Sequence, residues 1–353
     1  MSNHIDHIEI TNFKSIRHAK IEGCKRINVF IGYPNVGKSN ILEAISTGAY
    51  LNKSYEVPFS QLVRLGNTAE LFFDGATKNV VQINLSNEIE SQIEYISVNE
   101  FNLKFISQDP STSNEGDKYF ATIKQVNFKD KRVSATADST NGKTTSLKIK
   151  SYHFEKKISS ASEGGDVFLN SPGGENLASV LQFNKEFRKE VSDLFKEYNL
   201  KLTIDQETNS IKALKQLDDE TIFLIPFYQM ADTLQRLIFH KAAIMSNDNT
   251  VLLFEEPEAH MFPPYISNFT GDIIHDKIQN QYFISTHSPF VLNDLMEDAK
   301  QDLSIYAVGL KNGETTIKRI TDEEMHEIYQ YGIDLFFNLE DYLKDDQGGH
   351  SGV

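Results

Sequence analysis

Apolar and polar positions near the start of the chain predict a strand, a loop and a helix in succession. Residues 4–13, HIDHIEITNF, alternate between polar and apolar side chains, which is typical of a strand with one buried face. Residues 26–32, RINVFIG, form a continuous apolar run, as expected for a strand that is buried on both faces. Residues 39–51 then place Ile41 and Ile45 on one side of a predicted helix.

The middle of the chain is rich in short stretches that favour strands. Residues 159–177 form a glycine- and serine-rich connector, and residues 177–200 predict a single helix that buries Phe183, Phe187, Val191 and Leu194. Asn141-Gly142 is a strong signal for a hairpin turn. We therefore expect an antiparallel sheet with loops between residues 80 and 154, made from VVQINLS, FNLKFIS, KYFATIKQVNF and TSLKIKSYHF.

The second half of the chain returns to an alternation of strands and helices. Residues 235–245 predict a helix, and three apolar segments predict buried strands at 250–254, 281–285 and 303–308. The last residues, 346–353, have the composition of a disordered tail. The pattern predicts an α/β fold with a mainly parallel core sheet, to which an antiparallel β region and a helical segment are attached.

The composition argues against some classes of protein. No window approaches the apolar run of about 20 residues that spans a bilayer, and the N-terminal residues lack the core of a signal peptide. The single cysteine, Cys24, excludes an internal disulfide and a cysteine-rich zinc site. We therefore expect a cytoplasmic protein that makes no contact with a membrane.

The net charge of −15 is unusual for a protein that wraps nucleic acid over much of its surface. One local exception is the stretch from Lys124 to Lys157, which holds nine Lys or Arg residues against three acidic ones. Two interpretations stay open for this stretch. It is either the solvated face of a β-hairpin or a local contact for DNA.

Residues 32–39, GYPNVGKS, match the phosphate-binding spacing G-x-x-x-x-G-K-[ST] between the predicted strand and helix. Backbone N–H groups around the two glycines would surround the phosphates at a helix N-terminus. Lys38 would reach the β- and γ-phosphates, and the Ser39 hydroxyl would bind Mg²⁺. The candidate nucleotide-binding residues in this segment are Gly32, Asn35, Gly37, Lys38, Ser39 and Asn40.

The spelling PNVGKS also occurs in GTPases, so the choice between GTP and ATP depends on the other motifs. A guanine-reading N-K-x-D segment is approached only at residues 184–187, NKEF, where the aspartate is missing. No apolar strand leads into D-x-x-G, because Asp74 directly precedes Gly75. The GTPase interpretation thus lacks its two other supports.

Two later strands are followed by residues that suit phosphate chemistry. The strand at 250–254 delivers Glu255 and Glu256 to its carboxyl end, where α/β sheets bind ligands. Glu255 is placed to hold Mg²⁺, and Glu256 to orient the attacking water. The strand at 281–285 is followed by Thr286 and His287, and an imidazole there can donate a hydrogen bond to the γ-phosphate.

Taken in order, these motifs resemble the ABC-type ATPases of the RecF and SMC class, and most closely the OLD-like (overcoming-lysogenization-defect) ATPases. The similar segments are IEITNFKSIRHAKIEGCKRINVFIGYPNVGKSNILEAI, LVRLGNTAELFF, LLFEEPEAHMFPPYI and ISTHSPFVL. The second segment resembles the arginine loop of that class, which would put Arg64 near nucleotide or DNA. The segment NFKSI (12–16) resembles a strand near the nucleotide, so Lys14 and Ser15 are further candidate contacts.

The resemblance implies a mechanism in which two heads enclose two ATP molecules with Mg²⁺. Residues 228–244 match the segment that completes the partner's site, with Asp232 and Arg236 at the start of its helix. Ala231 and Thr233 replace the usual small signature residues there, which implies slow hydrolysis. Gln182 and Gln61 are weak matches to the glutamine loop.

The resemblance also implies an organisation and a role. We expect one ATPase head over residues 1–345, without the heptad arm or Toprim nuclease domain of some relatives. It would form a homodimer and work with a separately encoded effector, a nuclease or toxin, in anti-phage defence. Two alternatives stay open: a RecF-type DNA-repair ATPase, and a nucleotide-gated scaffold that restrains a toxin. The expected parts are a phosphate-loop lobe (1–60), an antiparallel β subdomain (61–158), a helical and signature segment (159–240), a strand-end carboxylate and histidine lobe (241–320) and a C-terminal helix (321–345).

Overall fold

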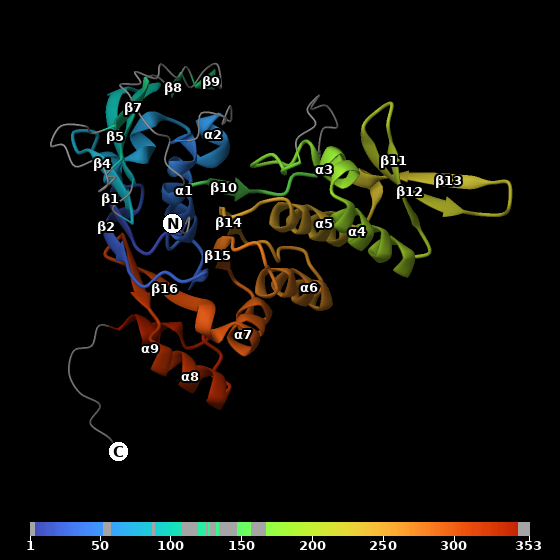
Figure 1. Cartoon of the computed structure of the whole chain (residues 1–353). Coiled ribbons are helices and arrows are strands. Elements are labelled where there is room, and N and C mark those ends of the chain that lie inside the picture. Colours follow the sequence, from blue (N-terminus) through green and yellow to red (C-terminus); the bar gives the residue numbers. More distant parts are fainter. Residues whose placement is uncertain are drawn as a thin grey trace.

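The computed structural model of the chain describes residues 4–51, 58–86, 89–107, 119–124, 126–127, 132–133, 147–156 and 167–344. Within these residues, a mixed central sheet lies between an antiparallel sheet and a layer of helices (Figure 1). The predicted turn at Asn141-Gly142, the tail at 346–353 and much of the basic stretch at 124–157 lie outside the described residues.

The central sheet joins strands from both halves of the chain, in the spatial order β10-β14-β15-β3-β16-β17. Neighbouring strands from β10 to β16 run parallel, and only β17 is antiparallel to its neighbour. The predicted mainly parallel core sheet is therefore confirmed. The bounds are Ile27–Gly32 (β3), Ile149–Tyr152 (β10), Val251–Glu255 (β14), Gln281–Thr286 (β15), Leu303–Lys311 (β16) and Glu314–Arg319 (β17).

Both faces of this sheet are buried, which explains the continuous apolar runs in its strands. Along β14, Val251 and Leu253 pack into one hydrophobic core, while Leu252 and Phe254 pack into the other. Because successive side chains of a strand point to opposite faces, one apolar run contributes to two cores. A slip by one residue would exchange the two sets of side chains, so the register is strongly specified.

The first core lies between the central sheet and the antiparallel sheet, and helix α1 (Lys38–Ser46) is buried within it. Ile41 and Ile45 of α1 pack there together with Ile8 and Ile10 of β1. The antiparallel sheet has the order β2-β1-β4-β5-β6-β7. Its strands are Ile8–Phe13 (β1), Ile16–Ile21 (β2), Val81–Leu85 (β4), Ile89–Ser97 (β5), Glu100–Ser107 (β6) and Tyr119–Lys124 (β7), and the short pair Val126–Asn127 (β8) and Arg132–Val133 (β9) follows.

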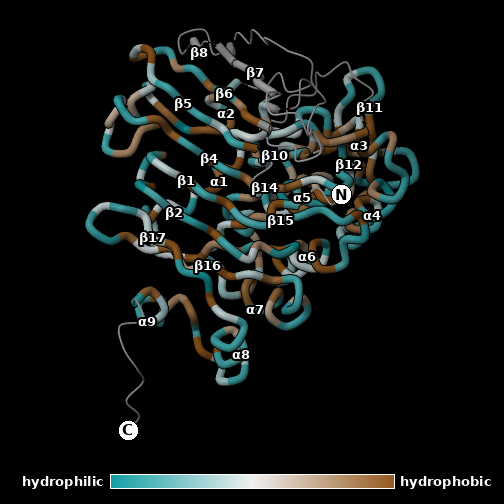
Figure 2. Tube along the Cα trace, turned by 60° about the vertical axis from the view of Figure 1, so that its left-hand side comes forward, coloured by the Kyte–Doolittle hydropathy of each residue, from teal (hydrophilic) through white to brown (hydrophobic). Residues whose placement is uncertain are grey.

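The second core lies between the opposite face of the central sheet and a layer of helices. Helices α8 and α9 lie together at one end of the molecule in both views (Figures 1 and 2), so the predicted single C-terminal helix is divided. The helices are Leu177–Phe183 (α3), Lys185–Glu197 (α4), Asp232–Met245 (α5), Pro263–Ile274 (α6), Pro289–Asp298 (α7), Asp322–Tyr331 (α8) and Leu339–Leu343 (α9), and a short helix, Phe59–Leu62 (α2), lies near α1.

Three strands in the region predicted to be helical form a separate antiparallel sheet, β11-β12-β13, which projects beside α3 and α4 (Figure 1). Their bounds are Lys201–Asp205 (β11), Ser210–Gln216 (β12) and Ile222–Pro226 (β13). Ile222 and Phe223 stay exposed, so this edge strand does not show the alternation of buried and exposed positions on which the sequence analysis relied.

Two segments differ from the strand assignments made above. Residues 12–16 are not one continuous strand: β1 ends at Phe13, β2 begins at Ile16, and Lys14 and Ser15 form the tight turn between them, with positive φ angles of 59° at Asn12 and 50° at Lys14. The segment TSLKIKSYHF contains β10, which runs parallel to β14 instead of joining the antiparallel sheet. Within β10, Ile149 packs into the first core near α1, and Tyr152 packs into the second core. Burial on both faces therefore decides that β10 pairs with β14.

The helix predicted over residues 177–200 is two helices that meet at Asn184. The Asn184 side chain accepts a hydrogen bond from the Phe187 N–H at 3.0 Å and caps the N-terminus of α4. Asparagine competes with the helical backbone in this way and favours a helix start over a helix interior. Phe187 is fully buried, whereas Phe183 is 54% exposed, so Phe183 does not belong to the buried face.

This difference predicts opposite results for two similar substitutions. Phe187→Ala should lower the free energy of unfolding by about 3–5 kcal/mol, because it leaves a cavity in a close-packed core. Phe183→Ala should change it by about 0.5 kcal/mol or less, because the ring is exposed. Urea unfolding followed by circular dichroism measures both. Equal losses of stability would contradict the assigned core.

His240 is a fully buried titratable group in the second core. Its ring lies among Phe239, Phe254 and Phe269, with ring-centroid distances of 5.3, 5.6 and 5.4 Å. Its Nδ1 atom has no hydrogen-bond partner within the described residues. Burial lowers the pKa of His240 to about 3, because this apolar site disfavours the charged imidazolium.

This burial predicts a loss of stability in acid. An unfolded histidine takes up a proton below its ordinary pKa of about 6.5, whereas folded His240 does so only near pH 3. Protonation of the unfolded state should therefore cost up to about 1.4 kcal/mol per pH unit as the pH falls through that window. Unfolding of wild type and His240→Phe, measured between pH 7 and about 4, gives this contribution as a difference. Parallel stability curves for the two proteins would contradict the prediction.

Candidate nucleotide-binding site

The carboxyl ends of four neighbouring parallel strands lie at one edge of the central sheet. Strand β3 ends at Gly32 and leads into the phosphate loop, and β10 ends at Tyr152. Strand β14 ends at Glu255, and β15 ends at Thr286 just before His287. A cleft of about 660 Å³ lies there. Of the predicted residues, it is lined by Lys14, Ser15, Asn35, Gly37, Lys38, Ser39, Asn40, Arg64, Arg236, Glu255, Glu256 and His287.

The two phosphate-loop glycines are required by close contacts. A Cβ atom at Gly32 would lie 2.3 Å from the Val308 carbonyl oxygen of β16, so no larger residue fits there. Gly37 has a φ of +102°, and a Cβ atom there would lie 2.2 Å from Thr315 Oγ1. Gly37 also directly precedes α1, so the backbone turns at the helix N-terminus as the motif predicts.

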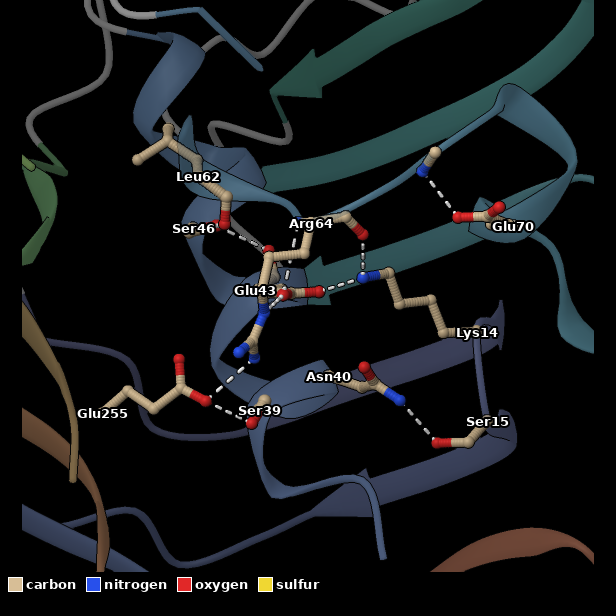
Figure 3. Close-up of polar contacts among 11 residues, drawn as sticks. Lys14, Ser15, Ser39, Asn40, Glu43, Ser46, Leu62, Arg64, Glu70 and Glu255 are labelled. Atoms are coloured by element: carbon tan, nitrogen blue, oxygen red, sulfur yellow. Dashed lines mark hydrogen bonds and ion pairs between the residues drawn. The ribbon is translucent and has the colours of Figure 1, made fainter. Parts of the chain in front are cut away.

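The phosphate loop is held from outside by a chain of hydroxyl groups. Thr315 Oγ1 donates to the Val36 carbonyl oxygen at 2.9 Å and shares a 2.7 Å hydrogen bond with Ser15 Oγ. Asn40 Nδ2 donates to Ser15 Oγ at 2.6 Å, as Figure 3 shows. The turn after β1, the first turn of α1 and β17 thus fix the loop together. This turn contact agrees with the expectation that Ser15 lies near the site.

Lys38 folds back over the loop that carries it. Its Nζ atom donates to the carbonyl oxygens of Gly32 and Tyr33, each at 2.9 Å. Burial lowers the pKa of the Lys38 ammonium, and the carboxylates of Glu256 and Glu255 partly offset this effect. Lys38 lines the cleft, where its ammonium can attract an anionic ligand.

Ser39, Glu255 and Arg64 meet at a single carboxylate oxygen (Figure 3). Ser39 Oγ donates to Glu255 Oε1, and an Arg64 guanidinium N–H donates to the same atom at 2.8 Å. Arg64 Nε donates to Glu43 Oε1, also at 2.8 Å. Lys14 pairs with the other oxygen of Glu43 and donates to the Arg64 carbonyl oxygen at 2.6 Å. Glu43 therefore fixes two cationic side chains at the edge of the cleft.

Glu256 and His287 form a second close pair of side chains in the cleft. Glu256 Oε1 lies 3.2 Å from His287 Nε2, and the Glu256 backbone has a positive φ of 44°. Burial and the nearby Lys38 ammonium lower the pKa of His287, while Glu256 acts in the opposite direction. The two side chains are 45% and 35% exposed, so both can reach a ligand in the cleft.

Asp232 and Arg236, to which the resemblance assigns a role in the partner's site, lie at the start of helix α5 but differ in their position relative to the cleft. Arg236 lines the cleft of its own chain, with its guanidinium 4.7 Å from the centroid of the Phe154 ring. Asp232 does not line the cleft; it accepts a hydrogen bond from Arg236 Nε at 3.0 Å and lies 3.5 Å from Lys156 Nζ. Arg236 is thus positioned to act within its own site. Neither Gln182 nor Gln61 is among the described lining residues.

His153 and Glu43 line the cleft and were missed by the sequence analysis. His153 follows β10, and the register that pairs Tyr152 with Phe254 places it beside Glu255. Burial lowers the pKa of His153, which favours a neutral imidazole. A signal for Glu43 was present, because it lies one helical turn after Ser39. No comparable signal existed for His153, since β10 was assigned to the wrong sheet.

The donor set fits a magnesium ion that shares its ligands with a nucleotide. A hydroxyl and a carboxylate oxygen, from Ser39 and Glu255, already touch and are ligands that Mg²⁺ prefers. The described residues contain no group of three or more His, Cys, Asp or Glu side chains able to hold a metal ion. Such an ion would therefore need phosphate oxygens and water as its remaining ligands.

Among the described residues, no helix is long and apolar enough to cross a membrane.

A protein-family model described as "AAA domain, putative AbiEii toxin, Type IV TA system" matches residues 27–293, which is more than half of the chain. The chain belongs to this family. The matched range begins at β3 and ends within α7, so it includes the phosphate loop, both strand-end glutamates and His287.

Two further proteins are similar to this member of the AAA-domain family. The DNA replication and repair protein RecF of Clostridium tetani (strain Massachusetts / E88) is 25% identical over 250 aligned positions, and the match covers 63% of this chain and 66% of RecF. The chain thus spans just under two thirds of that relative. An SMC head bound to the C-winged helix domain of ScpA matches with a TM-score of 0.50 and 14% identity, over 92% of this chain and 100% of that chain.

These comparisons confirm two predictions. The fold is the α/β fold of an SMC head, with a mixed sheet of mainly parallel strands, antiparallel sheets and helices. The chain is an ATPase, as its AAA-domain family predicts, and it is similar to the RecF and SMC class of ABC-type ATPases. The family match therefore favours the ATPase interpretation of the phosphate loop over the GTPase interpretation.

The shared oxygen of Glu255 predicts competition between Arg64 and a divalent cation. Arg64→Gln should tighten Mn²⁺ binding by the nucleotide-free protein roughly three- to tenfold, because it removes a partly exposed cation from that oxygen. Mn²⁺ titration followed by electron paramagnetic resonance measures this affinity. Arg17→Gln is the matched control, since Arg17 pairs with Glu314 and does not line the cleft. Unchanged or weaker Mn²⁺ binding by Arg64→Gln would contradict the competition.

Proposed function

We propose that this chain binds ATP with Mg²⁺ in the cleft and dimerises around the nucleotide. The observation that carries the proposal is the direct contact between Ser39 of the phosphate-loop helix and Glu255 at the end of β14. These side chains come from segments 216 residues apart, yet they form a hydroxyl–carboxylate pair beside the buried Lys38. Lys38 would hold the β- and γ-phosphates, and Ser39 and Glu255 would hold Mg²⁺.

The remaining residues supply orientation and charge. Backbone N–H groups of the loop around Asn35, Gly37 and Asn40 would surround the phosphates. Glu256 would orient a water molecule for in-line attack on the γ-phosphate, and His287 would donate a hydrogen bond to that phosphate. Mg²⁺, when bound, would neutralise the charge that develops on the phosphate oxygens. Arg64 and Arg236 add positive charge from two different sides of the cleft.

Dimerisation is supported by the exposure of the catalytic pair. Glu256 and His287 are 45% and 35% exposed at an open cleft, whereas phosphoryl transfer is favoured in a site that excludes bulk water. A second copy of the chain would cover the cleft. The resemblance to ABC-type ATPases supplies the geometry, in which the start of α5 from one chain faces the phosphates of the other. Asp232 does not line its own cleft, which agrees with a position facing the partner chain.

The biological role that we propose is control of a separately encoded effector, a nuclease or toxin, in anti-phage defence. The description of the family names a toxin and a type IV toxin–antitoxin system, which supports this class of role. The similarity to RecF supports one alternative, an ATPase of DNA repair and recombination. The replaced signature residues Ala231 and Thr233 favour the other alternative, a scaffold that binds ATP, hydrolyses it slowly and restrains a toxin.

The test is the molar mass of Glu256→Gln in solution, without nucleotide, with ATP and with GTP. This variant should keep ATP binding while losing the carboxylate that orients water, so ATP with Mg²⁺ should double the mass. Lys38→Ala in the same background should abolish the doubling, because the phosphates lose their main cationic contact. Light scattering after size-exclusion chromatography measures the mass. A mass insensitive to ATP, or one that responds to GTP alone, would contradict the proposal.

ATP hydrolysis by the wild-type protein separates the alternatives. Duplex DNA added to the wild-type protein should leave ATP hydrolysis unchanged if the chain controls a protein effector. A several-fold stimulation that declines with salt would instead favour the RecF-type role. Rapid multiple turnover by the isolated protein would exclude the restraining scaffold.

A further inference from the structure

A third carboxylate, Glu258, links the loops that carry Glu256 and His287. Glu258 is 9% exposed, so it lies beneath the cleft and does not line it. Its Oε1 atom accepts a hydrogen bond from Thr286 Oγ1 at 2.7 Å and another from the His287 backbone N–H at 3.0 Å. One side chain after β14 is thus bonded to two successive residues at the end of β15.

The two loops have a second connection through the backbone. The Glu256 N–H donates to the Ser285 carbonyl oxygen at 2.9 Å. The Glu256 and His287 side chains lie 3.2 Å apart. Their backbones are joined to the opposite loop by two hydrogen bonds, from the Glu256 N–H to Ser285 and from the His287 N–H to Glu258. Within the described contacts, Glu258 is the side chain that bonds to the backbone of the histidine loop, in addition to the contact between the Glu256 and His287 side chains. Its loss would free the His287 backbone while the backbone link remained.

The polar chemistry of Glu258 argues against a role in packing alone. Its second oxygen, Oε2, is buried and has no hydrogen-bond partner among the described residues. An unsatisfied buried carboxyl oxygen is costly, and an apolar residue of similar size avoids that cost. Burial also raises the pKa of Glu258, which is a further sign that the site disfavours its charge. The two hydrogen bonds that Oε1 accepts offset the cost of burying the unpaired Oε2, and they explain why a glutamate occupies this position.

We propose that Glu258 is a positioning residue that holds His287 at its contact with Glu256, and thereby sets the geometry of the groups that orient water and contact the γ-phosphate. The inference rests on the proposed function for the identity of that chemistry. The coupling between the two loops does not depend on the proposed function, because this coupling exists in the protein without nucleotide. Glu258 itself touches neither nucleotide nor water in this role.

The first experiment measures the coupling directly, without ATP. The imidazole Hε1–Cε1 resonance of His287, assigned with His287→Gln, should move in response to Glu256→Gln in the wild-type background. In a Glu258→Ala background, most of that response should disappear, because the histidine loop is no longer held at the contact. Glu258→Gln keeps an oxygen that can accept both hydrogen bonds and should preserve the response. An equal response in all three backgrounds would overturn the proposal.

The second experiment measures the consequence for hydrolysis. Glu258→Ala should lower kcat roughly 10- to 100-fold while ATP affinity stays within about twofold, because orientation is lost and binding is not. Glu258→Gln should retain kcat within about threefold. A parallel loss of affinity and kcat in Glu258→Ala, or an equal loss of kcat in Glu258→Gln, would indicate another role and overturn the proposal.

Thr286→Val keeps the inference testable if Glu258→Ala does not fold. This change of similar shape removes the Oγ1 that donates to Glu258 and accepts from the Ser288 N–H at 3.0 Å, and it leaves the His287 N–H in place. It should weaken the response of the His287 resonance to Glu256→Gln, and an unchanged response would overturn the proposal. If the chain binds no ATP, hydrolysis is absent in every variant, yet the resonance experiment still gives its answer. Failure of the proposed function is therefore distinguishable from failure of this inference.

Discussion

Parallel hydrogen bonding among β10, β14, β15 and β3 is the constraint on which the nucleotide site depends. Parallel strands end at the same edge of a sheet, so this pairing brings together His153, Glu255, His287 and the phosphate loop from distant parts of the sequence. Both faces of the sheet are covered by hydrophobic cores, which prevents a slip in register. Packing of the sheet therefore sets the geometry of the site, because the backbone positions already bring its side chains close to one another.

Charge balance is the second determinant of the site. Carboxylates at Glu43 and Glu255 share the cation Arg64, and Glu43 also holds Lys14. Partly buried ion pairs of this kind add little to stability, because desolvation offsets much of the attraction, but they fix orientation. The network is anchored at Glu43 within α1, so the phosphate loop, the Arg64 loop and the end of β14 are positioned relative to one helix.

The sequence was sufficient to place residues that directly follow an apolar strand. The phosphate loop, the paired glutamates after β14 and the histidine after β15 each follow an apolar strand, and the structure brings them together as expected. It was insufficient where long-range packing decides. The partner of β10 is a strand about 100 residues later, and that pairing alone puts His153 beside Glu255. The break at Asn184 was hidden because apolar periodicity continues across it, and β13 was hidden because its apolar side chains are exposed.

The hydroxyl contact between Ser15 and Thr315 joins residues that are 300 positions apart and helps to fix the phosphate loop between them. A ribosome adds residues from the N-terminus, so the loop at 32–39 emerges long before the strand that supports it. The nucleotide site can reach its final form only after β17 has been synthesised and has paired with β16. Completion of this site thus requires nearly the whole described chain, so truncated products would lack it even when their phosphate-binding motif is intact.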